Sequence, residues 1–85
     1  MKNDFLKYQA QTSPYPLGME VAHAKGSYIY DTNGKSYLDF VAGVSACTLG
    51  HQNQRVNDAI KAQLDKYSHV MVYGEYAQQP SVDFC

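Results

Sequence analysis

The chain has 85 residues, of which 45% are hydrophobic and 18% charged, and its formal net charge is -1. This composition is typical of globular proteins and argues against intrinsic disorder. Seven Lys and Arg beside eight Asp and Glu leave no basic surface for nucleic acid. The longest apolar stretch is far shorter than the ~20 residues that cross a bilayer, and the first residues contain no apolar signal segment. We therefore expect a cytoplasmic protein with neither nucleic acid nor a membrane as a partner.

Chains this short usually need disulfides, a metal or a partner in order to fold. The two cysteines, Cys47 and Cys85, are interpreted as free thiols, and the three histidines lack the spacing of a helical metal pair. No metal site is therefore expected. We expect the chain to depend on another chain or to be part of a longer polypeptide.

The predicted elements begin with a short helix, an extended segment and then a β-hairpin. Residues 4–10 can form the helix, and two prolines make residues 13–18 extended or turning. Residues 27–40 predict the hairpin, because two segments rich in aromatic and β-branched residues flank Asn33 and Gly34. This dipeptide favours a tight turn with positive φ at two adjacent positions. An isolated hairpin is marginally stable in water, so it is expected to pack on something.

A glycine-rich apolar loop over residues 41–52 follows the hairpin. It has neither helical nor strand periodicity, and its glycines permit positive φ or a close approach of backbone. His51 follows a glycine just ahead of a predicted helix, so it is expected either to contact a ligand or to cap the loop. Ser45 and Cys47 have no neighbouring base that would make them nucleophiles. Tyr15, held between two prolines, is the first aromatic candidate for a ligand pocket.

The remaining residues predict two helices. An apolar stripe with helical spacing predicts an amphipathic helix over residues 54–66, and the stripe consists of Val56, Ile60, Leu64 and Tyr67. An apolar and aromatic linker over 70–76 leads to the start of a further helix over 79–85, with Pro80 in its first turn. This last segment contains no terminating signal, so we expect the chain to be the leading piece of a longer polypeptide.

The segment 25–40, with Gly43-Val44-Ser45 and Leu49-Gly50-His51 after it, carries a resemblance to a known family. It is similar to the N-terminal portion of class III pyridoxal-phosphate-dependent aminotransferases, such as the acetylornithine, ornithine and 4-aminobutyrate aminotransferases. The shared pattern is G-x-Y-hydrophobic-x-D-x-x-G-x-x-Y-hydrophobic-D-F, a glycine loop, L-G-H and a helix containing Gln63-Leu64. The sequence departs from the pattern at Asn53-Gln54, where the family has His-Pro.

The resemblance implies an α+β piece, with hairpin and amphipathic helix, of the small domain of a fold-type I transferase. It implies pyridoxal 5'-phosphate (PLP) as cofactor, an amino donor and a keto-acid acceptor as substrates, and a homodimer. In the family the catalytic lysine and the cofactor-binding residues lie beyond the length of this chain. No catalytic or cofactor-binding residue is therefore assigned here, and the chain alone is expected to be inactive.

The resemblance also suggests which residues contact substrate. By position these are Val44 and Ser45 in the loop, which faces the cofactor in related enzymes, and Tyr15 ahead of the hairpin. Val44 stands where ornithine-type enzymes carry a pocket tyrosine, so a copy of their specific site is not implied. The alternative is that Val44 only packs and Ser45 satisfies the loop backbone. A stand-alone α+β interaction module without enzymatic activity is the rival interpretation of the whole chain.

Overall fold

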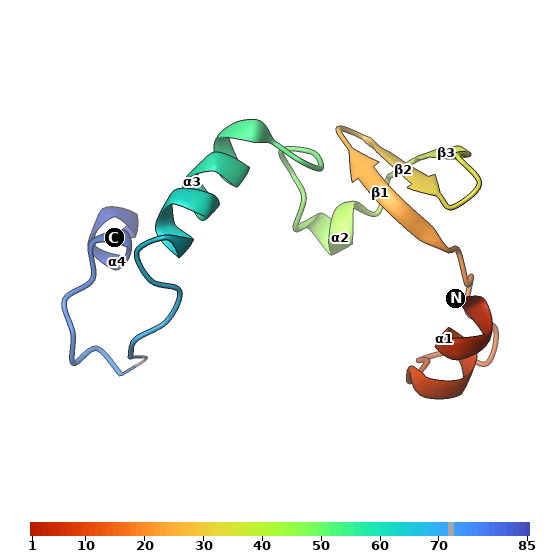
Figure 1. Ribbon diagram of the computed structural model, residues 1–85, viewed down its shortest axis with the longest axis horizontal. Coiled ribbons are helices and arrows are strands. Elements are labelled where there is room, and N and C mark those ends of the chain that lie inside the picture. The colour runs from red at the N-terminus through yellow and green to blue at the C-terminus, as the bar shows by residue number, and fades with distance from the viewer. Residues whose placement is uncertain (72) are drawn as a thin grey trace. The chain divides into compact units, whose positions relative to one another are not determined.

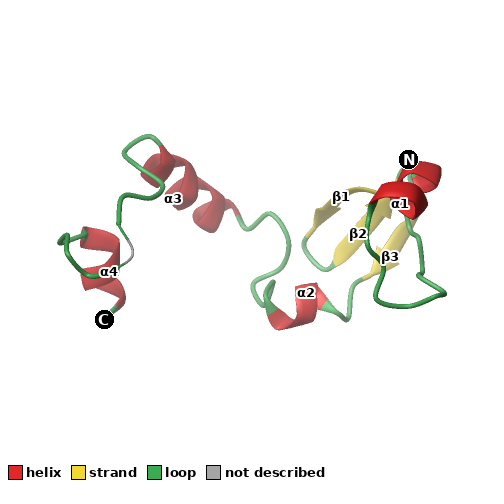
Figure 2. Cartoon of the chain, turned by 90° about the horizontal axis from the view of Figure 1, so that it is seen from below, coloured by secondary structure: helices red, strands yellow, loops and turns green. Residues whose placement is uncertain are grey.

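The computed structural model describes residues 1–71 and 73–85, so residue 72, in the predicted linker 70–76, lies outside the description. The chain divides into two compact units, Met1–Gln54 and Arg55–Cys85. Figure 1 follows the chain from red to blue, and Figure 2 separates helices from strands by colour. A small antiparallel sheet combined with helices confirms the predicted α+β class.

The first unit contains helix α1 (Lys2–Tyr8) and an antiparallel sheet with the strand order β1 (Val21–Lys25), β2 (Tyr28–Asp31), β3 (Ser36–Leu38). The pairing of β2 with β3 confirms the predicted hairpin. Strand β1 is a finding that the sequence pattern does not predict, because Val-Ala-His-Ala-Lys contains few residues that favour strands. It forms because Gly26, with φ +58°, turns the chain so that β1 pairs with β2.

The turn between β2 and β3 is organised by the Asp31 carboxylate. Its Oδ1 accepts the backbone N–H groups of Asn33 and Lys35, both at 2.9 Å, and its Oδ2 accepts the Tyr37 hydroxyl at 3.1 Å. Gly34 has φ +85°, but Asn33 has no positive φ, so the predicted pair of positive φ angles is wrong. This turn requires positive φ at one position only, which Gly34 supplies. The Asp31 side chain stabilises the turn by accepting backbone N–H groups.

The chain leaves the sheet at Leu38, two residues earlier than predicted. Phe40, expected in the second strand, lies outside it and is 89% exposed. The reason is Asp39, whose side chain accepts the N–H groups of Val41 and Ala42 and so turns the backbone away from the ladder. The predicted irregular loop then contains one short element, α2 (Ala42–Ser45).

The second unit is formed by the amphipathic helix and the segment that follows it. Helix α3 spans Gln54–Leu64 and confirms the predicted helix, although it ends two residues early. There the Lys66 N–H bonds the Gln63 carbonyl three residues back, which tightens the last turn. Helix α4 spans Gln79–Phe84, with proline in its first turn as predicted. Within residues 1–71 and 73–85, no helix has the length and apolarity that crossing a membrane requires.

The described residues of neither unit form a hydrophobic core of their own. Across the part of the chain that the structure describes, no side chain is fully buried. The apolar stripe of α3 is about half exposed, at 40% for Val56, 53% for Ile60 and 58% for Leu64. Because burial of apolar surface is the main favourable term in folding, these elements need further surface against which to pack.

Candidate functional site

The candidate site is the loop 41–52, and Asp39 joins the start of that loop to the sheet. One carboxylate oxygen, Oδ1, accepts the N–H groups of Val41 and Ala42, both at 3.0 Å. The other, Oδ2, lies 2.6 Å from Nε2 of His51. The Ala42 N–H, and after it the His51 ring, hold the pKa of the Asp39 carboxyl below its ordinary value, since both favour the charged form.

His51 joins the end of the same loop to the β1–β2 turn. Its backbone N–H donates to the Gly26 carbonyl at 2.8 Å, and the Gly26 N–H donates to the His51 carbonyl at 3.0 Å. The neighbouring Gln52 side chain donates to the Ala24 carbonyl at 2.6 Å. Of the two roles expected for His51, these contacts support the loop cap.

Between these two anchors the backbone adopts a left-handed conformation. Ala42, Gly43, Val44 and Ser45 have φ angles of 50°, 60°, 57° and 70°. For each of the three residues other than glycine this region costs about 1–2 kcal/mol. Strain of this kind persists only where surrounding contacts enforce it, and it concentrates at functional sites. The contacts of Asp39 and His51 anchor the two ends of the loop, and the Cys47 N–H donates to the Ala42 carbonyl at 2.9 Å within it.

The three residues predicted to contact substrate are not all brought together. Val44 and Ser45 lie side by side on the left-handed turn, and Val44 is 86% exposed. Tyr15 is 90% exposed, and its backbone N–H donates to the Ser13 hydroxyl at 3.1 Å. Among the described residues no hydrogen bond or ring contact joins Tyr15 to the loop. Exposure leaves Val44 free to meet a ligand or another part of the protein.

Two residues that organise the site, Asp39 through its carboxylate and Ala42 through its backbone N–H, were not singled out from the sequence. The signal that could have found Asp39 is its place just before the glycine loop, since Asp favours bonds to backbone N–H groups a few residues on. A cavity of about 190 Å³ is lined by Asp39 and by residues of the loop and of the β1–β2 turn, among them Gly26, Cys47 and His51. The side chains of Asp39 and His51, which both line this cavity, are bonded to each other.

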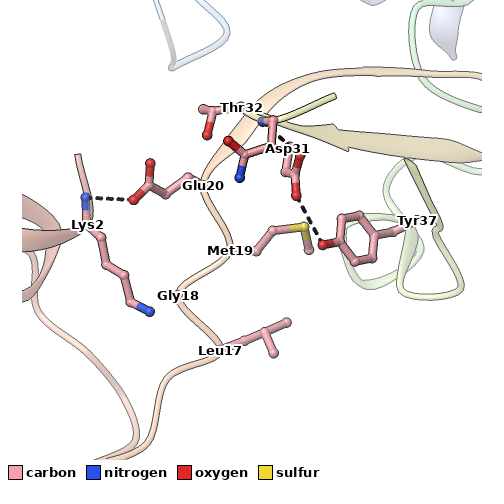
Figure 3. A pocket seen from close by; sticks show the side chains of 9 residues that line it. Lys2, Leu17, Gly18, Met19, Glu20, Asp31, Thr32 and Tyr37 are labelled. Carbon is pink, nitrogen blue, oxygen red and sulfur yellow. Dashed lines mark hydrogen bonds between the residues drawn. The ribbon is translucent and has the colours of Figure 1, made fainter. Parts of the chain in front are cut away.

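A larger cavity, of about 650 Å³, lies in the first unit away from the loop residues (Figure 3). Its lining includes one amine, Lys2, and two carboxylates, Glu20 and Asp31. Glu20 accepts the Lys2 backbone N–H at 3.2 Å, while both oxygens of Asp31 are engaged in the β-turn.

PLP requires a lysine amine for its aldehyde and a cradle of N–H donors or cations for its phosphate. The larger cavity has two carboxylates, which repel a phosphate, beside its one amine, so it does not fit this cofactor. The described residues also contain no cluster of three or more His, Cys, Asp or Glu that could hold a metal ion.

Comparisons with known proteins match this arrangement to one family. The family model described as aminotransferase class-III matches residues 8–85. An acetylornithine aminotransferase of Bacillus amyloliquefaciens is 46% identical over 52 residues, which are 61% of this chain and 23% of that protein. The corresponding protein of a Synechocystis species is 44% identical over 68 residues, 79% of this chain and 15% of that protein. The chain thus spans less than a quarter of the length of these relatives.

Solved structures of transaminases are also similar to this chain. An S-selective transaminase from an Arthrobacter species, solved with alanine bound, has a TM-score of 0.82 and 31% identity, over 96% of this chain and 18% of that one. An omega transaminase from Pseudomonas jessenii in complex with PMP has a TM-score of 0.82 over 98% of this chain and 20% of that one; at 24% identity it supports the fold alone. The match of the family model over residues 8–85 establishes that the chain belongs to the class-III aminotransferases.

Proposed function

We propose that this chain is the N-terminal part of a PLP-dependent aminotransferase that transfers an amino group from an amine or amino-acid donor to a keto acid. We propose further that the whole enzyme is a cytoplasmic homodimer and that residues 1–85 alone are inactive. The family match supports the activity. The inactivity is supported by the lack of a buried hydrophobic core in the described residues and by the misfit of the cofactor to the larger cavity.

Within that enzyme the loop 41–52 contributes to the substrate pocket, with Val44 and Ser45 as its contact residues and Tyr15 as a further one. The observation that carries this proposal is the left-handed turn, anchored at both ends, which presents an exposed Val44. A small side chain at this position leaves room for the donor, and the Ser45 hydroxyl can supply one hydrogen bond. The proposed role of Tyr15 is supported by its position in the sequence alone.

Activity is tested by expressing the full-length enzyme that carries this chain, loading it with PLP and assaying pairs of amino donors and keto acids. We expect visible absorbance from bound cofactor and transfer of the amino group. The isolated chain should show neither. A wild-type enzyme that binds the cofactor but transfers no amino group to any acceptor would contradict the proposal. An isolated chain that is monomeric and melts cooperatively would favour the stand-alone module instead.

The role of the loop is tested by Val44→Tyr, which fills the space that valine leaves. We expect kcat/KM for bulky amino donors to fall more than kcat/KM for small ones, because ring volume excludes the larger donor. Ala62→Tyr, at an exposed position of α3 outside the apolar stripe, adds the same ring outside the loop 41–52 and serves as the control. Unchanged relative kcat/KM values across donors in the Val44 variant would count against the pocket role.

A further inference from the structure

Asp39 and His51 close the base of the loop 41–52. Asp39 directly follows β3, and His51 stands just ahead of α3, so the bond between Oδ2 and Nε2 at 2.6 Å joins the two ends of the loop. The Asp39 side chain is only 5% exposed and that of His51 only 20%. A short bond between a carboxylate and an imidazole, largely shielded from water, is stronger than a bond between neutral groups.

The same carboxylate also determines how the loop starts. Its Oδ1 accepts the N–H groups of Val41 and Ala42, and Ala42 is the first of the four residues with positive φ. Without these bonds the left-handed turn keeps only the backbone bonds from the Ser45 N–H to the Val41 carbonyl and from the Cys47 N–H to the Ala42 carbonyl, and so loses part of what offsets its strain. Asp39 therefore links the position of His51 to the backbone conformation at Val44 and Ser45.

We propose that Asp39 and His51 are positioning residues for the amino donor, which act by holding the left-handed turn so that Val44 and Ser45 keep one orientation toward it. The inference rests on the proposed function of the loop. Both residues act through the backbone of the turn rather than on the reacting atoms. A misplacement of about 1 Å at such a contact lowers activity by on the order of 100-fold.

The chain supplies a matched control for this proposal. Asp31 accepts three bonds in the same arrangement as Asp39, because one oxygen accepts two backbone N–H groups and the other bonds a side chain. Asp31 belongs to the turn between β2 and β3 and not to the loop. Asp31→Asn therefore measures the cost of weakening such a carboxylate, and Asp39→Asn measures that cost together with the effect on the loop.

At His51 two substitutions separate the bond from the ring. His51→Gln places an amide N–H close to the position of Nε2, so it can still donate to Asp39, whereas His51→Ala removes the donor. In the full-length enzyme we expect Asp39→Asn and His51→Ala to lower kcat/KM about 10-fold to 100-fold, and His51→Gln and Asp31→Asn to lower it less than about 3-fold. The double variant Asp39→Asn, His51→Ala should lose no more than the worse single variant.

A merely structural role is distinguished by donor selectivity. If the pair positions the turn, the ratio of kcat/KM for bulky and small donors changes in Asp39→Asn and His51→Ala, at unchanged cofactor content per folded enzyme. If the pair only stabilises the fold, the amount of active enzyme falls and the ratio stays constant, which would overturn the proposal. Equal losses in His51→Gln and His51→Ala, or in Asp31→Asn and Asp39→Asn, would overturn it as well.

A second measurement separates this proposal from the proposed function. Hydrogen exchange of peptides covering residues 40–50 should be faster in Asp39→Asn and His51→Ala than in wild type, Asp31→Asn and His51→Gln. If the wild-type enzyme transfers no amino group, the proposed function fails, and equal exchange in all variants would then also overturn the role of the pair. If His51→Ala does not fold, the rates of hydrogen exchange in Asp39→Asn and Asp31→Asn are compared instead.

Discussion

The Cα of Gly50 lies so close to Gly26 that a Cβ at residue 50 would stand 3.2 Å from the Gly26 carbonyl oxygen. Gly50 also has φ +84°, a region that residues with a Cβ rarely adopt. The two glycines thus allow the end of the loop to pair with the β1–β2 turn through the backbone bonds of His51.

The close contact between Gly50 and Gly26 predicts that Gly50→Ala destabilises the full-length enzyme more than Gly34→Ala does. Both positions have nearly equal positive φ, but a Cβ at Gly34 would meet nothing within 4 Å. Gly34→Ala should therefore cost about 1–2 kcal/mol from strain alone. Gly50→Ala should cost about 1–3 kcal/mol more from overpacking against backbone. Urea-induced unfolding measures both, and equal costs would show that the close approach is absent.

The left-handed turn predicts an unusual tolerance at Val44. Because glycine adopts φ near +57° without strain, Val44→Gly should change the free energy of unfolding by less than about 1 kcal/mol. The same exchange at Val56, inside α3, should cost about 1 kcal/mol or more, since glycine is unfavourable in a helix interior. Thermal unfolding of the two variants makes the comparison. A loss at Val44 as large as that at Val56 would contradict the turn.

A fall in pH should reduce the contribution of Asp39 to the free energy of unfolding. Bonds from the Ala42 N–H and then from His51 lower the pKa of its carboxyl below the ordinary value of 3.8. A group whose pKa is lowered on folding stabilises the protein above the unfolded pKa, and this stabilisation is lost as the pH falls through the folded pKa. The difference in unfolding free energy between wild type and Asp39→Asn should thus shrink as the pH falls from about 5 to below about 4.

The measurement is denaturant unfolding across that pH range. Asp31→Asn should behave in the same way, because the Lys35 N–H and the Tyr37 hydroxyl lower the pKa of the Asp31 carboxyl too. A gap between wild type and Asp39→Asn that persists unchanged below pH 4 would mean that the carboxylate charge contributes nothing to the loop.

The exposed stripe of α3 predicts where the rest of the enzyme packs. Ile60 is 53% exposed in this chain, and we expect further residues of the full-length enzyme to cover it. Ile60→Asp should then destabilise the enzyme by several kcal/mol, because it buries an unpaired charge. Ala62→Asp introduces the same charge about 200° around the helix and should stay within about 0.5 kcal/mol. Similar melting temperatures for the two variants would show that the stripe remains in solvent.

Local sequence was sufficient for the elements whose signals are themselves local. The aromatic strands around Gly34, and the 3.6-residue stripe of α3, predict the hairpin and the helix because side-chain period and turn residues act within a few positions. The pattern from Gly26 to Phe40 likewise led to the family that the comparisons establish.

Strand β1, the end of β3 and the left-handed turn became visible only in the tertiary structure. Strand β1 depends on its pairing with β2, and the turn depends on bonds from Asp39 to residues that no periodicity connects with it. His51 meets Asp39 across twelve residues, a contact that is visible only after the loop has closed. The pairing of β1 with β2 and the contacts of His51 depend on the path of the folded chain. The bonds from the Val41 and Ala42 N–H groups to Asp39 are local, but residue preference alone does not decide whether they form.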